Sequence, residues 1–174
     1  MLSQIKAGIF TGLFLISLSD NSEVNTPTQT EPSKKANSVT LVRKDSEKKV
    51  EVHVNGELFT AYLYPESIAK PVLYPIKSAG GNDLTRGFPL NPRPGERVDH
   101  PHHIGMWFNY GDVNGLDFWN NSDAIPAEKK GGYGTIVHTG ILKAKEGKGQ
   151  ASLEVSMDWV GSNGEVLLKE KTTF

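Results

Sequence analysis

The chain has 174 residues, with 19 basic and 20 acidic side chains and a formal net charge of -1. A balance this close to zero argues against capture of nucleic acid by a basic surface. The absence of cysteine excludes disulfides, thiolate chemistry and Cys-ligated zinc. The 18 glycines and 10 prolines, placed between short β-branched runs, favour one all-β domain over a helical one.

Residues 1–19 have the pattern of a secretory signal peptide. Lys6 supplies the positive charge, and the apolar run over 7–18 is shorter than the about 20 residues that span a bilayer. Small residues at Ser17 and Ser19 allow cleavage before Asp20. The segment L-I-S-L-S is similar to a bacterial lipoprotein signal, but it lacks the lipid-accepting Cys. We therefore expect a secreted or periplasmic protein with no membrane span after cleavage.

Residues 20–38 are almost entirely polar, with only Val24 and Ala36 as apolar residues. Such a segment buries too little surface to offset its ordering entropy, so we expect a disordered linker. The β domain is then expected over residues 39–174.

Residues 50–64 alternate between apolar and polar side chains on both sides of Asn55-Gly56. Asn-Gly suits the positive φ angles of a tight hairpin turn, so the segment predicts a β-hairpin. Residues 70–76 contain two prolines, and because proline cannot donate a ladder hydrogen bond they predict a short edge strand.

Further strands are expected over residues 104–110, 116–119 and 134–145. A second hairpin is expected from residues 151–160 and 165–174 around Asn163-Gly164. The elements together predict an antiparallel β-sandwich of the supersandwich type. The chain stops at Phe174 within an alternating run, and we expect it to be the N-terminal part of a longer sandwich.

Residues 86–119, which we call the central loop, are too rich in Pro, Gly and Asn for an ordinary buried element. They hold three of the five histidines and two of the three tryptophans. Loops of this kind on a rigid scaffold carry function more often than strands do, so the site is expected here.

The run Asp99-His100-Pro101-His102-His103 concentrates groups that transfer protons or bind metals. In an extended chain His100 and His102 would share one face and His103 the other. One hypothesis is acid–base catalysis by His100, His102 or His138, with Asp99 or Asp112 as partner. Another is a divalent metal on His100, His102 and His138, although no metal motif is present and no cofactor is assigned. A third is that the histidines only hydrogen-bond the loop.

Trp107, Tyr110 and Trp119 lie among amide and carboxylate side chains. Such a mixture suits a sugar, whose C–H face stacks on aromatic rings while its hydroxyls take hydrogen bonds. About half of the aromatics are expected in the core instead, with Phe108 or Phe118 as architecture. Arginines of the loop bind either a ligand carboxylate or the loop's own carbonyls. The candidate ligand-binding residues are Arg86, Asn91, Arg93, His103, Trp107, Asn114 and Trp119.

The run from Gly87 to Trp119, with its core D-H-P-H-H-I-G-M-W-F-N-Y-G-D-V-N-G-L-D-F-W, resembles the bacterial domain family recorded as "methane oxygenase PmoA". The later T-I-V-H-T-G around His138 also fits, and the resemblance covers about residues 50–174. It implies an exported β-sandwich similar to galactose mutarotase-like domains, with a role near carbohydrate metabolism. It implies no catalytic residues, and family members are longer than this chain.

The sequence therefore predicts an exported β-sandwich with a site for a carbohydrate or other small molecule on the central loop. If the protein is an enzyme, sugar-directed acid–base chemistry by histidine is expected first. A metal-dependent oxidoreductase or hydrolase, and a non-catalytic sugar-binding or structural module, remain alternatives.

Overall fold

The structure is a computed structural model that describes residues 38–174. The expected signal peptide, residues 1–19, and linker residues 20–37 lie outside the described residues, so both stay predictions. Ser38, the last residue of the expected linker, is already paired with the domain. It forms an isolated bridge with Lys148 and donates its backbone N–H to Asn55 Oδ1 at 3.0 Å.

The first sheet contains four antiparallel strands in the order of the sequence. They are β1 (Val39–Lys44), β2 (Lys49–Val54), β3 (Glu57–Leu63) and β4 (Val72–Leu73), and the 3-10 helix η1 (Asp45–Glu47) joins β1 to β2. The hairpin at Asn55-Gly56 is confirmed, with φ angles of 55° and 88°. The proline-flanked strand is also confirmed, because β4 lies at the edge of this sheet.

The second sheet is antiparallel in the order β5-β6-β7. Its strands are β5 (Thr135–Gly147), β6 (Gln150–Val160) and β7 (Val166–Thr173), and the 3-10 helix η2 (Ala127–Gly132) precedes them. The second hairpin is confirmed, but its turn is wider than Asn163-Gly164 alone. The connection runs from Gly161 to Glu165, whose backbones are hydrogen-bonded at 2.8 Å, and only Gly164 has a positive φ.

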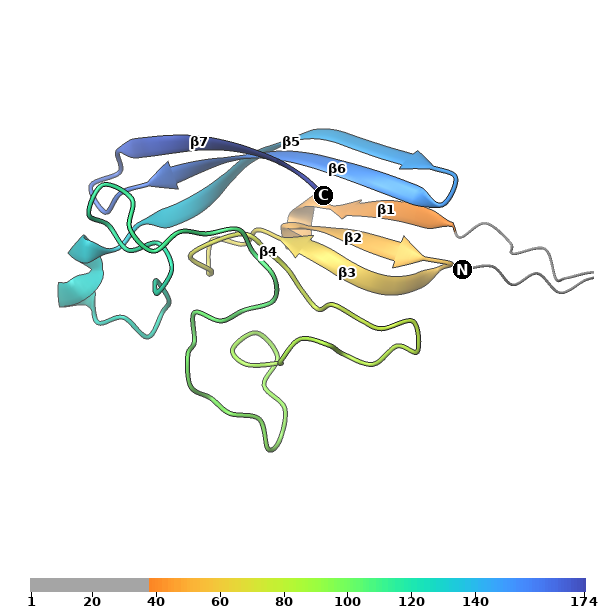
Figure 1. Cartoon of the computed structure of the whole chain (residues 1–174), viewed down its shortest axis with the longest axis horizontal. Coiled ribbons are helices and arrows are strands. Elements are labelled where there is room, and N and C mark those ends of the chain that lie inside the picture. Colours follow the sequence, from red (N-terminus) through yellow and green to blue (C-terminus); the bar gives the residue numbers. More distant parts are fainter. Residues whose placement is uncertain (1–37) are drawn as a thin grey trace, which may run out of the picture. The chain divides into compact units, whose positions relative to one another are not determined.

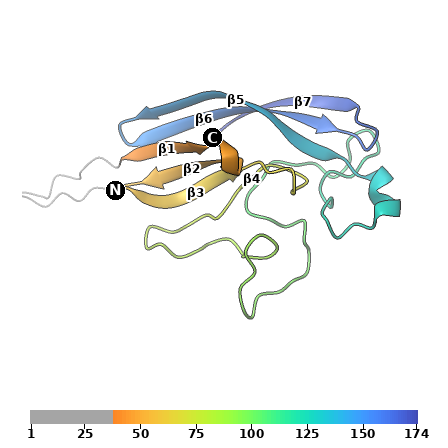
Figure 2. The same ribbon diagram turned by 180° about the vertical axis from the view of Figure 1, so that it is seen from behind.

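The core lies between the two sheets. Along β6 the buried side chains occur at every second position, as expected for a strand with one covered face. They are Leu153, Val155, Met157 and Trp159, and they form one cluster with Val50 and Tyr62 of the first sheet. The two sheets form stacked layers in Figure 1, and the same stacking is visible from behind in Figure 2. The expectation of an all-β, sandwich-like fold is confirmed.

The strand expected over residues 104–110 is not formed. Only Met106 pairs, in an isolated bridge with Leu73. Gly105 explains the interruption, since its φ is +53° and a Cβ on it would lie 2.4 Å from the Leu73 carbonyl oxygen. Residues 116–119 also form isolated bridges instead of a strand. The central loop therefore remains a long connection outside the two layers (green in Figure 1).

One aromatic side chain of the central loop belongs to the core. Phe118 is 1% exposed, and its ring centroid lies 4.9 Å from that of Trp159. Phe108, the other expected architectural residue, is 68% exposed and lies outside the core. No helix among residues 38–174 is long and apolar enough to cross a membrane.

The substitution Gly134→Ala is expected to destabilise the domain by about 1–3 kcal/mol. A Cβ at Gly134 would lie 2.1 Å from the Phe118 ring, so either the ring or the start of β5 must move. The matched control is Gly131→Ala, because a Cβ there meets nothing within 4 Å. Urea denaturation of both variants measures the effect, and equal stability of the two would contradict the role of Phe118.

Candidate functional site

The first part of the central loop is organised by the Glu96 carboxylate. It accepts hydrogen bonds from the backbone N–H of Gly87 at 2.9 Å and of Phe88 at 3.2 Å, and from Arg93 Nε at 2.8 Å. The Gly87 N–H bond, together with the Arg93 side chain, lowers the pKa of Glu96 to about 2. The loop is thereby held by an internal ionised carboxylate in place of sheet pairing.

The two arginines proposed as ligand-binding residues contact the central loop itself and the residues just before it. Arg93 binds Asp83 at 3.0 Å and the Thr85 carbonyl at 2.7 Å, in addition to Glu96. Arg86 donates to the carbonyls of Phe88 and Asp99. The sequence left two roles open for these arginines, binding of a ligand carboxylate or of the loop's own carbonyls, and the carbonyl contacts correspond to the second. Asn91 is exposed, and its backbone N–H closes a turn on the Gly87 carbonyl at 2.7 Å.

The three loop histidines lie together, which corrects the expectation that His103 points away. His100 has a φ of +49°, and the N–H of His103 donates to the His100 carbonyl at 2.9 Å, so the chain turns here. In a turn the alternation of an extended strand does not apply. The ring centroid of His103 lies 5.0 Å from that of His100 and 4.3 Å from that of His102.

Two indoles flank these imidazoles. The ring centroids of Trp107 and Trp119 are 5.4 Å apart, and His103 lies 6.2 Å and 6.0 Å from them, respectively. Trp119 is 39% exposed, whereas the Trp107 Nε1 atom is buried with no hydrogen-bond partner. We call His100, His102, His103, Trp107 and Trp119 the histidine–tryptophan cluster.

Lys70, which sequence reasoning missed, lies beneath this cluster. Its side chain is 1% exposed, its Nζ donates to the Trp119 carbonyl at 2.7 Å, and it lies 4.7 Å from the centroid of the Trp107 ring. Within residues 38–174 no carboxylate forms a salt bridge with Lys70. Burial lowers its pKa from the usual 10.5 to about 8, and the charge of Asp117 offsets only part of this effect. A lysine in the otherwise apolar run K-P-V-L-Y-P-I was the only signal for it.

The electrostatics of the cluster favour neutral imidazoles. Burial, and then the charges of neighbouring histidines and Lys70, lower the pKa of both His102 and His103. The Nδ1 atom of His100 lies 3.1 Å from the Asp99 carboxylate. Burial raises the pKa of Asp99, but the hydrogen bond and charge of His100 outweigh it and lower that pKa overall. Of the two carboxylates that the sequence hypothesis named, Asp99 is the one that contacts a loop histidine.

Asp112 and Asn114 are used in a turn. The Asp112 carboxylate accepts the Gly115 N–H at 2.8 Å, and Asn114 adopts a φ of +53° in a tight hairpin between Val113 and Leu116. The expected pairing of Asp112 with a loop histidine is therefore not observed. Both residues shape the loop, and their assignment to catalysis and ligand binding has no geometric support.

His138 does not join the loop histidines. Its Nδ1 lies 3.0 Å from the Tyr62 hydroxyl, and its ring centroid lies 4.1 Å from that of Tyr64. It lines a cavity between the first sheet and β5, whereas His102 lines another. The contacts of His138 therefore give no support to one site that combines it with His100 and His102. The strand β5 places His138 against Tyr62 of β3 and against Tyr64, which follows that strand.

The cavity beside His102 has a volume of about 70 Å³. Asn121 and Ser122 from the segment after Trp119 also line it, as do Ser67 and Ile68 from the β3–β4 connection. The Ser122 hydroxyl is buried with no hydrogen-bond partner within the described chain. An unpaired buried hydroxyl is costly unless a water or ligand atom satisfies it. The cavity is thus suited to one small polar group.

No group of three or more His, Cys, Asp or Glu side chains among residues 38–174 is placed to hold a metal ion. The imidazoles of the cluster pack against one another in stacked and edge-to-face pairs, and His138 contacts Tyr62 instead. The metal hypothesis therefore gains no support from this geometry and stays a prediction from the sequence.

Replacement of Lys70 by Met is expected to change the pH dependence of stability. Between pH 8 and 10.5 the unfolded lysine keeps a proton that the folded lysine has released, so the wild-type free energy of unfolding rises with pH. The rise amounts to about 3 kcal/mol over this interval for a shift of this size. Urea denaturation at several pH values, with the exposed Lys169→Met as control, measures it. Parallel curves for Lys70→Met and wild type would contradict burial of the ammonium.

Comparison with known proteins gives one family for this domain. The family described as "Family of unknown function (DUF6807)" matches residues 49–174. Searches of curated proteins and of solved structures found no match. The matched range starts at the first residue of β2 and contains Lys70, His138 and the whole histidine–tryptophan cluster. The chain therefore belongs to the DUF6807 family.

Proposed function

We propose that the histidine–tryptophan cluster is a binding site for a neutral carbohydrate or similar polyhydroxylated small molecule. The observation that carries the proposal is the partly exposed indole of Trp119 beside three imidazoles. An indole face accepts the C–H face of a sugar ring, and imidazole nitrogens exchange hydrogen bonds with its hydroxyls.

The charge state of the cluster supports a neutral ligand. The lowered pKa values of His102 and His103 keep these rings uncharged near pH 7, where each ring has one donor and one acceptor nitrogen. The guanidinium groups of Arg86 and Arg93, which would favour an acidic ligand, are engaged with loop carbonyls and carboxylates. The small cavity beside His102 offers a place for one hydroxyl group of the ligand.

The proposal also includes export of the protein, which the signal-like residues 1–19 support. A role near carbohydrate metabolism is supported by the resemblance to the PmoA-type family. A divalent metal on the same histidines is an alternative, and metal analysis of the purified protein tests it. A non-catalytic sugar-binding module is the second alternative.

Trp119→Ala is expected to weaken the binding of a sugar that the wild type binds by about tenfold or more. Stacking of a ligand ring on an aromatic side chain contributes on the order of 1–3 kcal/mol to the binding free energy. The probes are a glycan array followed by calorimetry on the sugars that bind. The matched control is Phe59→Ala, since Phe59 is 42% exposed but lies in β3, outside the loop. No sugar binding by the wild type, or equal loss in both variants, would overturn the proposal.

The Asp99–His100 contact favours catalysis at the same site. A carboxylate 3.1 Å from Nδ1 orients the ring for proton transfer, as acid–base chemistry on a sugar requires. If bound sugars are converted, Asp99→Asn is expected to lower kcat by about 100-fold while binding persists. Turnover is followed by NMR, with the exposed Asp123→Asn as control. Undiminished turnover in Asp99→Asn would exclude this role, and binding without any turnover would identify a module.

A further inference from the structure

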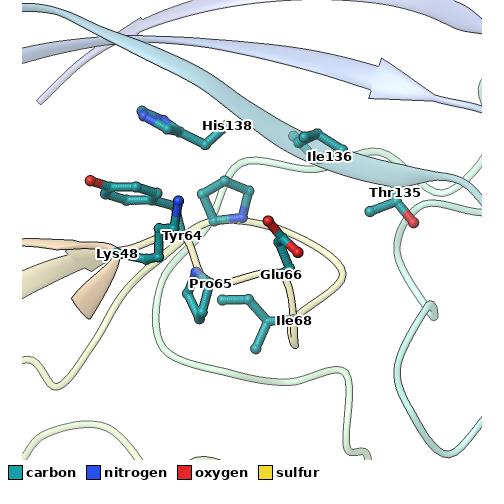
Figure 3. A pocket seen from close by; sticks show the side chains of 10 residues that line it. Lys48, Tyr64, Pro65, Glu66, Ile68, Thr135, Ile136 and His138 are labelled. Carbon is teal, nitrogen blue, oxygen red and sulfur yellow. The ribbon is translucent and has the colours of Figure 1, made fainter. Parts of the chain in front are cut away.

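A second cavity is lined by His138, and it shares Ile68 with the small cavity beside His102. Its volume is about 220 Å³, and its walls come from η1–β2, the end of β3 and β5. Figure 3 shows the side chains of Lys48, Tyr64 and Glu66 on the side opposite to His138 and Ile136. We call this cavity the His138 pocket, with Lys48, Tyr64, Glu66, Ile68, Pro71, Ile136 and His138 as its principal lining residues.

The imidazole of His138 is held in place by contacts with two tyrosines. The Tyr62 hydroxyl is 3.0 Å from His138 Nδ1, and Tyr62 is 1% exposed, so the contact is shielded from water. The Tyr64 ring packs against the imidazole at 4.1 Å. The other nitrogen, Nε2, has no hydrogen-bond partner within the described part of the chain. A ring fixed at one nitrogen and unpaired at the other is suited to bind a ligand.

Two opposite charges line the same pocket without neutralising one another. Over residues 38–174, neither the Lys48 ammonium nor the Glu66 carboxylate forms a salt bridge or a side-chain hydrogen bond. Most other charged residues of the first sheet are paired, for example Lys44 with Glu51 at 2.8 Å and Lys49 with Glu47 at 2.7 Å. Lys48 and Glu66 are thus two unpaired charges that line the same cavity.

The remaining lining is apolar. Ile68, Pro71 and Ile136 form one wall between the charged residues and the core, and Pro71 and Ile136 are buried. The volume is below the roughly 300–1,000 Å³ of pockets that hold drug-sized ligands, so the ligand must be small. A ligand that carries both charges would complement the pocket, because its anionic group could pair with Lys48 and its cationic group with Glu66.

We propose that the His138 pocket binds a free amino acid with an apolar side chain. Lys48 pairs with the ligand carboxylate, Glu66 pairs with its ammonium, and the aliphatic wall receives its side chain. His138 contributes a hydrogen bond from Nε2. This site is independent of the carbohydrate site proposed on the central loop.

The test is calorimetry of the full chain at pH 7 with L-leucine and two analogues that each lack one charge. Leucinamide has no carboxylate, and 4-methylpentanoate has no ammonium. Leucine is expected to bind at least about tenfold more tightly than either analogue, as two charge-assisted contacts imply.

Variants of the two charged residues sharpen the test, because both side chains are exposed and their replacement leaves the core intact. Lys48→Gln is expected to weaken the binding of leucine by about tenfold but to leave the affinity for leucinamide unchanged. Glu66→Gln is expected to weaken the binding of leucine but to leave the affinity for 4-methylpentanoate unchanged. The exposed Lys169→Gln and Glu165→Gln serve as controls. Absence of leucine binding, equal affinity for the analogues, or indifference to both variants would overturn the proposal.

Discussion

The position of Phe118 between the sheets is the constraint on which the central loop depends. Its ring packs on Trp159 and lies over Gly134, whose N–H donates to the Asp117 carbonyl at 3.1 Å. Because the backbone is pinned on both sides of Phe118, the next residue, Trp119, is directed outward. Asn109 Nδ2 donates to the Phe118 carbonyl at 2.9 Å and so ties the preceding arm of the loop to the same point. One buried ring thus orients an indole that is exposed.

A loop of this length outside both sheets must satisfy its backbone groups without a ladder. Glu96 and Arg86 do so with several backbone contacts each, and Arg93 adds one to the Thr85 carbonyl. The indole of Trp119 and the imidazoles around it are among the side chains that the loop does not use in this way. Polar and aromatic groups that remain available after the loop has been stabilised are candidates for ligand contact, and these belong to the larger set that the sequence proposed for the site.

The parts of the fold that the sequence predicted correctly are those set by neighbouring residues, such as turn residues and the alternation of a strand. Asn55-Gly56 specifies its hairpin within a few residues, and the alternation of β6 specifies its buried face. The strand expected at 104–110 failed because Gly105 faces the Leu73 carbonyl, which lies 32 positions away and leaves no local mark. The partners of Lys70 and His138 are similarly distant, at Trp119 and Tyr62. His100 takes a positive φ that no neighbouring residue signals, and the grouping of the imidazoles depends on that angle.

Burial of the Lys70 ammonium affects the electrostatics of the histidine–tryptophan cluster. An uncharged donor would hold the Trp119 carbonyl equally well without the desolvation that lowers the lysine pKa to about 8. Burial is the largest cause of the lowered pKa of His102 and His103, and the charge of the ammonium lowers both pKa values further. It therefore helps to keep these rings uncharged, which is the state in which an imidazole both donates and accepts a hydrogen bond. A costly group whose effect falls on the candidate ligand-binding residues is the pattern expected of a functional site.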